Sequence, residues 1–225
     1  MGTLQIIELK KDILASNDEQ SEILRARLKT EQTFLLNLMS SPGSGKTTTI
    51  IRTIEAMNSN YRIGVLEADI DGAIDSERVE KTGTKVVQLH TGGMCHLEAC
   101  MTRQGIEGLG TKELDFVILE NVGNLVCPAE FDTGASKNVM ILSVPEGDDK
   151  PLKYPLMFAI VDVLLINKVD CLPMFDFDVD KMKKRALAIN PELKIFEISA
   201  KTGQGFSLWV NWLSEEIEKW NSSSC

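Results

Sequence analysis

The chain has 225 residues, of which 43% are hydrophobic, and its 33 acidic and 24 basic residues give a formal net charge of −9. This composition suits one domain with a substantial core, and the acidic balance, with no run of Lys and Arg, argues against nucleic acid as a partner. No apolar stretch approaches the roughly 20 residues that a membrane span needs, and the N-terminus is too charged for a secretory signal, so we expect a cytoplasmic protein without membrane contact.

Residues 1–32 are rich in charged and helix-favouring residues, and we expect them to form a helical extension that serves as a lid or docking arm. Asn17 and Gln20 have the spacing of a capping box, which predicts that a second helix begins at Asn17. We expect residues 33–221 to form the main domain and residues 222–225 a short polar tail.

From Phe34 onward, short apolar runs alternate with amphipathic segments of helical periodicity. Several runs are apolar almost throughout, as strands are when helices cover both faces of a parallel sheet. The sequence therefore predicts a doubly wound α/β fold with a mostly parallel, seven-stranded sheet. Because ligands of such sheets bind outside the carboxyl ends of the strands, motifs that directly follow strands are the candidate functional segments. The seven runs are FLLNLM, RIGVLEA, KVVQLH, FVILEN, VMILSV, VLLIN and KIFEIS.

The first run leads into a glycine loop, SSPGSGKTTT, which is followed by a segment with helical spacing. In this arrangement backbone N–H groups and a helix N-terminus hold phosphates, Lys46 reaches the outer phosphates, and the Thr47 hydroxyl binds magnesium. The usual pattern begins with Gly at the position that Ser40 occupies here. The order of strand, loop and helix still predicts a phosphate site, formed by Gly43, Ser44, Gly45, Lys46, Thr47 and Thr48.

Two later motifs, NKVD and SAK, also follow strands. In GTPases with this pair, a carboxylate such as Asp170 accepts hydrogen bonds from the ring N–H and the exocyclic amine of guanine, an edge that adenine lacks. Lys168 can cover the base, and the Ala200 N–H can meet its carbonyl. Losing such a buried pair costs a few kcal/mol, so one carboxylate can decide GTP over ATP. The predicted guanine site comprises Asn167, Lys168, Asp170, Ser199, Ala200 and Lys201.

Five widely spaced cysteines favour reduced thiols over a disulfide framework in a chain of this size. Cys95 and His96 are adjacent at what reads as a helix start, and Cys127 follows the ENVGN loop. Thiolate and imidazole suit Ni²⁺ and Zn²⁺ alike, and a helix N-terminus would lower the thiol pKa. Three ligands are too few for a closed zinc site, so water completes the set or two subunits share the ion. The alternative is two part-buried reduced cysteines and a His96 that caps a helix.

Between Phe34 and Trp220, seven segments in order resemble the hydrogenase nickel-incorporation GTPases of the HypB family. The resemblance implies a SIMIBI-like P-loop GTPase that hydrolyses GTP slowly with Mg²⁺ and forms a nucleotide-dependent homodimer. It also implies that the chain binds nickel or zinc and helps insert nickel into a [NiFe]-hydrogenase. Its partners would be the hydrogenase large subunit and a second nickel-maturation accessory protein. The segments are SSPGSGKT, EADID, TGGMCH, ENVGNLVCPAEFD, SVPEGDDKPLKYP, NKVD and SAKTG.

Three alternatives stay open at this point. Urease-accessory GTPases share the glycine loop and a Cys/His pair. A GTP-dependent dimerising scaffold with slow hydrolysis would need the same nucleotide motifs, and a pure metal carrier would need only the cysteines and histidine. Metal storage is disfavoured, because the chain has only two histidines.

The resemblance also implies roles for single residues. The magnesium carboxylate falls on Asp69, where it complements Thr47, and Asp75 is a candidate for positioning water. Glu120 stands where many GTPases carry the Asp of D-x-x-G. The implied catalytic set is thus Lys46, Asp69, Asp75 and Glu120, and the implied nickel or zinc ligands are Cys95, His96 and Cys127. Lys150 or Lys153 is a candidate cation for the phosphates, and the apolar run from Cys171 to Phe175 is a candidate dimer contact.

Overall fold

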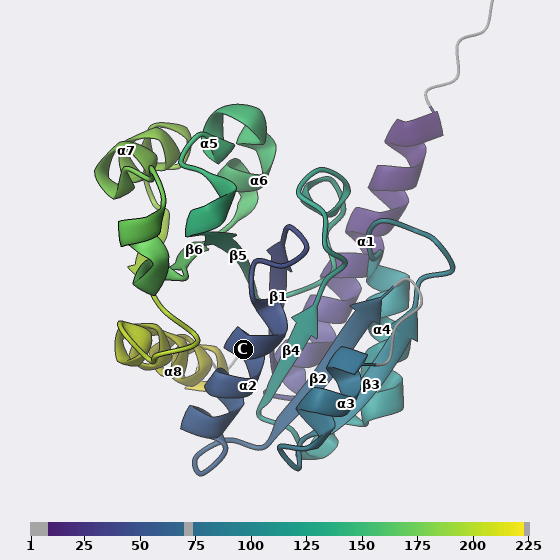
Figure 1. Cartoon of the computed structure of the whole chain (residues 1–225). Helices are drawn as coiled ribbons and strands as arrows, with labels where there is room; N and C mark the ends of the chain where they lie inside the picture. The colour runs from purple at the N-terminus through teal and green to yellow at the C-terminus, as the bar shows by residue number, and fades with distance from the viewer. Residues whose placement is uncertain (1–8, 70–73, 223–225) are drawn as a thin grey trace, which may run out of the picture.

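The computed structural model describes residues 9–69 and 74–222, with the side chains of residues 9–12, 69, 74 and 111 excepted. Its centre is a seven-stranded sheet in the order β3-β2-β4-β1-β5-β6-β7, and every strand pair is parallel. The predicted sheet is therefore confirmed (Figure 1). The strands are β1 (Phe34–Ser40), β2 (Ile63–Asp69), β3 (Lys85–His90), β4 (Phe116–Glu120), β5 (Lys137–Ser143), β6 (Val163–Asn167) and β7 (Lys194–Glu197).

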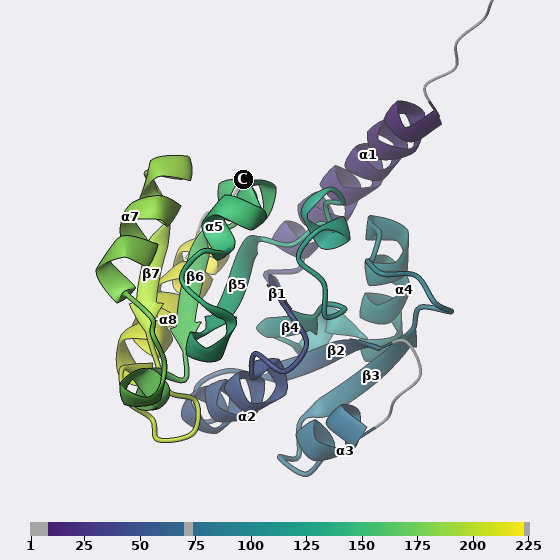
Figure 2. The ribbon, with the colours of Figure 1, turned by 45° about the horizontal axis from the view of Figure 1, so that its top comes forward.

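Helices cover both faces of this sheet (Figures 1 and 2). Helices α2, α3 and α8 pack on one face, α1 and α4 on one half of the other face, and α6 and α7 on its second half. The helices are α1 (Leu9–Thr30), α2 (Lys46–Met57), α3 (Ile74–Glu80), α4 (Ala99–Leu109), α5 (Lys150–Lys153), α6 (Pro155–Ile160), α7 (Val179–Ile189) and α8 (Phe206–Ser222).

Strand β1 explains why the apolar runs do not alternate with polar residues. Leu36 and Leu38 point into the core beneath α2 and α8, whereas Leu35 and Met39 point into the cores on the opposite face. A strand that is buried on both faces needs apolar side chains at odd and even positions alike. The same arrangement places the carboxyl end of β1, and the glycine loop after it, at the centre of the sheet.

The prediction of a second helix at Asn17 is wrong, because α1 runs unbroken from Leu9 to Thr30. Asn17 does not cap a new helix: its side chain is buried and bonds to backbone groups of two other segments. Further along α1, Leu24 and Leu28 are buried in the core beside α4.

The predicted domain boundaries stay predictions. Helix α1 ends at Thr30 and β1 begins at Phe34, on either side of the boundary expected at residue 33. At the other end α8 continues to Ser222, and the rest of the predicted tail lies outside the described residues. Across the part of the chain that is described, no helix combines the length and apolarity required to cross a membrane.

Candidate functional site

The glycine loop connects β1 to α2 and depends on two glycines. Gly43 and Gly45 have φ angles of +74° and +103°, a backbone region that favours glycine. A Cβ atom at Gly45 would also lie 2.6 Å from Nδ2 of Asn167, so a side chain does not fit there. Helix α2 begins directly with Lys46 and has no acidic residue in its first turn. Its N-terminus therefore favours an anion such as a phosphate group.

Ser40, which replaces the usual first glycine of this motif, has a defined role in the loop. Its buried hydroxyl accepts hydrogen bonds from Lys46 Nζ at 3.1 Å and from Ser44 Oγ at 2.5 Å. Ser40 donates in turn to the carbonyl of Ser41 at 2.8 Å. The departure from the usual pattern thus leaves the loop intact and gives the lysine ammonium group a fixed partner.

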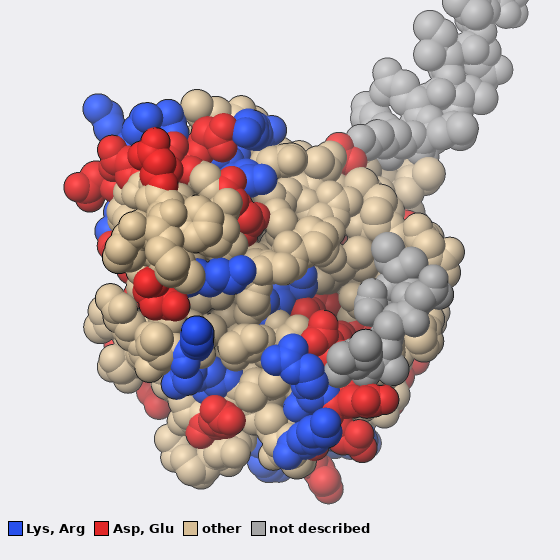
Figure 3. All heavy atoms as spheres, in the orientation of Figure 1, with Lys and Arg blue, Asp and Glu red and all other residues tan. Residues whose placement is uncertain are grey.

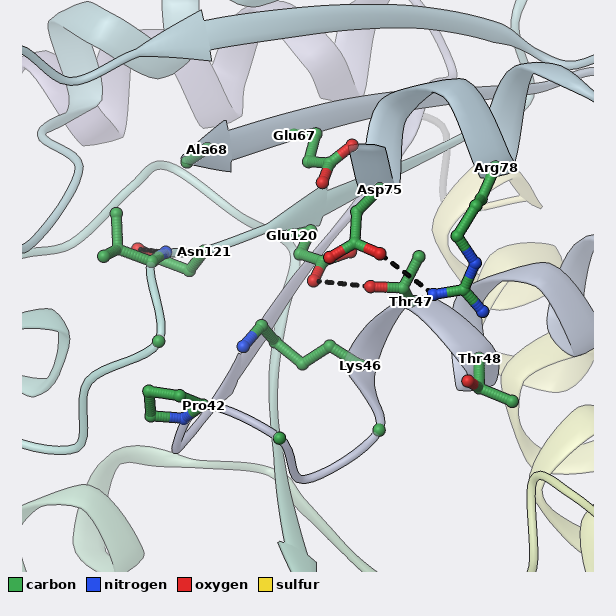
Figure 4. Close-up of a pocket in the computed structure, with 14 residues that line it drawn as sticks. Pro42, Lys46, Thr47, Thr48, Glu67, Ala68, Asp75, Arg78, Glu120 and Asn121 are labelled. Carbon is green, nitrogen blue, oxygen red and sulfur yellow. Dashed lines mark hydrogen bonds and ion pairs between the residues drawn. The ribbon is translucent and has the colours of Figure 1, made fainter. Parts of the chain in front are cut away.

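A cleft of about 400 Å³ opens beside the loop, and acidic side chains line its inner wall. Figure 4 shows Glu67, Asp75 and Glu120 pointing toward one another and toward Thr47. Glu120 is only 5% exposed, and its Oε1 accepts a hydrogen bond from Thr47 Oγ1 at 3.3 Å. Its other carboxylate oxygen is buried and has no hydrogen-bond partner among the described residues.

Glu67 was not among the predicted site residues. It lies directly opposite Glu120 in the pairing of β2 with β4 and is only 3% exposed. One signal was present in the sequence. Glu67 stands two positions before Asp69, which was predicted to bind magnesium, and the alternation of side chains along a strand predicts from the sequence that the two share a face.

The cleft has the donors that Mg²⁺ requires. This ion binds through one or two carboxylates, hydroxyl or water oxygens, and substrate phosphates. The unpartnered oxygen of Glu120 and the adjacent Thr47 hydroxyl fit that set. The assignment of Thr47 and Asp69 to magnesium stays a prediction, because the Asp69 side chain lies outside the described residues. Asp75 does line the cleft, where it pairs with Arg78 at 2.9 Å.

Burial is the main cause that raises the pKa of Glu120 to about 8, with a smaller contribution from the carboxylates of Glu67 and Asp75 and against the lowering effect of the Lys46 charge. The folded chain therefore keeps this proton while the unfolded chain loses it near the ordinary value of 4.5. Protonation of Glu120 thus adds to the free energy of unfolding at low pH. This contribution is lost progressively as the pH rises from 4.5 toward 8.

In buffer with a chelator and no nucleotide, we expect wild type to lose stability relative to Glu120→Gln as the pH rises through that window. The difference should grow by at most about 1.4 kcal/mol per pH unit. Urea unfolding of both proteins at several pH values measures it, with the exposed Glu192→Gln as the control. Parallel profiles for wild type and Glu120→Gln would contradict the raised pKa.

The two predicted base-recognition motifs meet at the glycine loop. Asn167, at the end of β6, is buried and donates from Nδ2 to the carbonyl of Ser44 at 2.9 Å. Its Oδ1 accepts from the N–H of Ala200 at 3.0 Å. Lys168, with a left-handed φ of +62°, donates from Nζ to the carbonyl of Gly43 at 2.7 Å. Asn167 and Lys168 therefore connect three segments that are distant in sequence: the glycine loop, NKVD and SAK.

Asp170 has the properties of a hydrogen-bond acceptor for a base. The buried Ser199 hydroxyl holds the pKa of Asp170 below its usual value, so the carboxylate is ionised at neutral pH. Its Oδ1 makes no hydrogen bond to any residue that the structure describes. Lys201 is exposed, and its charge also contributes to the lowered pKa of Asp170. The geometry brings the predicted guanine residues together, and their contact with a nucleotide stays a prediction.

The predicted metal ligands also come together. One donor atom each from Cys95, His96 and Cys127 lies within 4.8 Å of the others. The two sulfur atoms are 2.9 Å apart, and Nδ1 of His96 is 3.9 Å from the Cys95 sulfur. The first two residues lie between β3 and α4, and Cys127 lies between β4 and β5. Asn124 reinforces the link by donating to the Cys95 carbonyl at 3.3 Å.

His96 is held by neighbours that the sequence motifs did not indicate. Its ring stacks on Phe131, with centroids 3.9 Å apart and an interplanar angle of 18°. Its Nε2 lies 3.8 Å from a carboxylate oxygen of Glu98. The stacked Phe131 ring therefore limits rotation of the imidazole, whereas 3.8 Å is too long for a hydrogen bond from Nε2 to Glu98.

The expectation that a helix N-terminus lowers the thiol pKa is not met. Helix α4 begins only at Ala99, after Glu98 in the N-cap position. The pKa of Cys95 is instead raised, chiefly because its thiol shares a hydrogen bond with Cys127. A metal ion would therefore have to displace a proton held between the two sulfur atoms.

The other residues predicted to have a role, two lysines and an apolar run, lie outside the cleft beside the glycine loop and outside the group of metal ligands. Lys153 pairs with Asp149 at 2.6 Å, and Lys150 lies over the ring of Tyr154. In the apolar run after NKVD, Met174 is 70% exposed and Phe175 43% exposed. The end of this run is therefore surface, whereas Leu172 at its start packs against the core, and the role of the run as a dimer contact stays a prediction.

Residues 34–197 match the sequence profile of the CobW/HypB/UreG nucleotide-binding domain. The hydrogenase maturation factor HypB of Azotobacter chroococcum mcd 1 is 43% identical over 212 residues, covering 94% of this chain and 70% of that protein. The chain belongs to the HypB family. The probable HypB of Methanocaldococcus jannaschii is 35% identical and covers 97% of this chain and 99% of its own length. The family predicted from the motifs is confirmed.

HypB structures share the fold. The crystal structure of HypB from Helicobacter pylori in complex with nickel has a TM-score of 0.86 at 38% identity, covering 93% of this chain and 99% of that one. HypB from Archaeoglobus fulgidus has a TM-score of 0.85 at 40% identity, covering 91% and 100%. The signal recognition particle receptor FtsY from Elizabethkingia anophelis, at 14% identity and a TM-score of 0.54, shares only the fold.

Proposed function

We propose that this HypB chain is a GTP-hydrolysing metallochaperone switch that binds nickel and helps insert it into a [NiFe]-hydrogenase. The observation that carries the proposal is the shared loop between the two clusters. The connection after β4 begins at Glu120 in the nucleotide cleft and reaches Cys127 in the metal cluster. A single loop therefore belongs to both sites. The HypB relatives are hydrogenase maturation factors, and the related Helicobacter pylori structure is a complex with nickel.

Close packing connects that loop to the phosphate loop. A Cβ atom at Gly123 would lie 3.0 Å from the Pro42 side chain and 3.2 Å from its backbone nitrogen. Because the two loops already touch, a phosphate that moves the glycine loop must also move the segment that leads to Cys127. Such a packed contact supports nucleotide-dependent change in the metal site.

Nickel or zinc would be cargo at Cys95, His96 and Cys127. These soft and borderline donors suit both ions, and three ligands leave a coordination position open. An open position permits transfer of the ion to another protein, or completion of the site by a second copy of the chain. The exposed Met174 and Phe175, next to the base-recognition loop, support a homodimer whose formation responds to nucleotide.

In hydrolysis the protein would act mainly through position and charge. Lys46 and the N-terminus of α2 would balance charge on the transferring phosphoryl group, and Asp170 would select guanine. Thr47, Glu120 and Asp69 would hold Mg²⁺, which neutralises phosphate charge when it is bound. Glu120, with its pKa of about 8, would release its proton on that occasion. Glu67 and Asp75 would orient water in the same cleft.

The expected partners are a second nickel-maturation accessory protein and the hydrogenase large subunit, in the cytoplasm. One relative, from Helicobacter pylori J99, is described as a hydrogenase/urease maturation factor at 39% identity. A urease-directed role is therefore the second candidate function.

The test of the switch is nickel affinity measured with GDP and with a non-hydrolysable GTP analogue. We expect the two affinities to differ by roughly 5- to 150-fold, the usual size of coupling between two sites. Lys46→Ala, which weakens phosphate binding, should remove the difference and abolish GTP turnover. Equal nickel affinities in the two nucleotide states of wild type would refute the switch, even if each ligand binds well.

A further inference from the structure

Asn17, in the middle of α1, uses both ends of its side-chain amide to join two segments outside that helix. It is 5% exposed. Its Nδ2 donates to the carbonyl of Asp132 at 2.8 Å, and its Oδ1 accepts from the N–H of Ala99 at 2.9 Å. Figure 2 shows α4 and the segment between β4 and β5 next to α1.

Both partners of Asn17 stand next to the metal cluster. Ala99 opens α4 and follows the segment that contains Cys95 and His96. Asp132 directly follows Phe131, whose ring stacks on His96, in the segment that begins with Cys127. One buried amide therefore links the two segments that supply the metal ligands.

The segment with Cys127 has a second attachment to α1. Arg25 Nη2 donates to both carboxylate oxygens of Asp132, at 2.7 and 2.6 Å, and Ser21 Oγ donates to one of them at 3.0 Å. This attachment does not involve α4. The distinct contribution of Asn17 is therefore the connection to the segment with Cys95 and His96.

The capping of α4 supports a specific role for Asn17 rather than general packing. Glu98 occupies the N-cap position, but its side chain makes no capping hydrogen bond. Asn17 supplies an acceptor for the first helical N–H instead. The Glu98 carboxylate lies 3.8 Å from Nε2 of His96, too far for a hydrogen bond.

We propose that Asn17 is a positioning residue for the metal cluster, through which α1 sets the separation between Cys95 with His96 and Cys127. This inference rests on the proposed function, because it concerns the same nickel site. It gives the N-terminal helix a part in metal affinity although α1 contributes no ligand. A buried amide bonded to two segments fixes their relative position more tightly than apolar contact does, because its hydrogen bonds are directional.

The experiment measures Ni²⁺ binding by competition with a chromophoric chelator, together with the nickel–thiolate absorption spectrum. We expect Asn17→Ala to lower Ni²⁺ affinity by roughly 10- to 100-fold, as the loss of an outer partner does, and to change the spectrum. GTP affinity should not change, and it serves as the check that the variant is folded.

Asn17→Asp separates positioning from helix capping. Aspartate still offers an acceptor to Ala99 N–H but has no donor for the Asp132 carbonyl. If linking the segments is what matters, Asn17→Asp behaves like Asn17→Ala. Wild-type Ni²⁺ affinity and spectrum in Asn17→Asp would mean that Asn17 only caps α4, and would overturn the proposal. Wild-type values in Asn17→Ala would overturn it as well.

Asn190→Ala is the matched control. Like Asn17, Asn190 bonds to backbone groups of another segment: its Nδ2 donates to the carbonyls of Phe158 at 3.3 Å and Val161 at 2.9 Å, in and directly after α6 and away from the metal cluster. Its loss should lower thermal stability and leave Ni²⁺ affinity unchanged. If wild type and Cys95→Ala bind Ni²⁺ equally, the proposed function itself fails. If Cys95→Ala loses binding while both Asn17 variants keep it, only the present inference fails.

Discussion

Replacing Asp170 by Asn should lower GTP affinity by roughly 100-fold or more, because a site built to bond two donors is left with a mismatched partner. Xanthine carries a carbonyl group where guanine carries an amine, and the side-chain amide in Asp170→Asn offers the donor that this carbonyl needs. We therefore expect Asp170→Asn to prefer XTP over GTP. Competition with a fluorescent nucleotide measures both affinities.

The same measurements need a control that removes a nearby negative charge without touching the base pocket. Asp176→Asn serves, because Asp176 is exposed a few residues along the same connection. It should bind GTP like wild type. Unchanged GTP preference in Asp170→Asn would mean that the carboxylate does not read the base, although Ser199 holds it ionised.

Removing one thiol from the metal cluster should have a comparably large effect. Cys95→Ala and Cys127→Ala each delete one of the three predicted metal ligands, whose donor atoms lie within 4.8 Å of one another. Losing an outer partner of a ligand costs about 10- to 100-fold in metal affinity, so losing the ligand should cost at least about 100-fold. We expect the double variant to be little worse than either single one, because both sulfur atoms are needed for the same chelate.

Cys171→Ala is the control for this series, since Cys171 is a free thiol that does not belong to the cluster. Nickel titration with detection of the thiolate band should give wild-type affinity for it. GTP binding should survive in every cysteine variant. Nickel affinity that falls equally in all of them would point to a general loss of structure and not to ligation.

Motif order predicted much of the fold and of the candidate site. Each functional motif follows an apolar run, and a parallel sheet gathers the ends of its strands at one edge, so the sequence could predict that Lys46, Asp170 and Glu120 lie at that edge. Glu67 was missed because it lies inside a strand, where a charged residue gives no motif. Its burial becomes visible only when β2 is seen beside β4.

Asn17 shows why the rest required a structure. As a sequence feature it marks a local helix cap, and the inference drawn from it was wrong. Its actual partners, Ala99 and Asp132, are far away along the chain. Propensity and spacing describe neighbours in sequence. The hydrogen-bond partners of a buried amide are set by the tertiary structure.

The described part of the surface in Figure 3 shows no grouping of basic side chains of the kind that binds a nucleic acid. Figure 3 shows acidic and basic side chains intermixed on the face it presents, with no continuous basic surface among the described residues there. A nucleic-acid backbone binds to grouped Lys and Arg. The phosphate-binding features of this chain are instead concentrated in a single short loop.

That loop also lowers the entropic cost of binding a nucleotide. Because the hydroxyl of Ser40 holds Lys46 in place, the long side chain has lost much of its rotational freedom before any nucleotide arrives. Binding then exchanges one oxygen partner for another and does not have to order a mobile chain. Ser40→Gly would free the ammonium group, and the arriving phosphates would meet a disordered cation in place of a prearranged one.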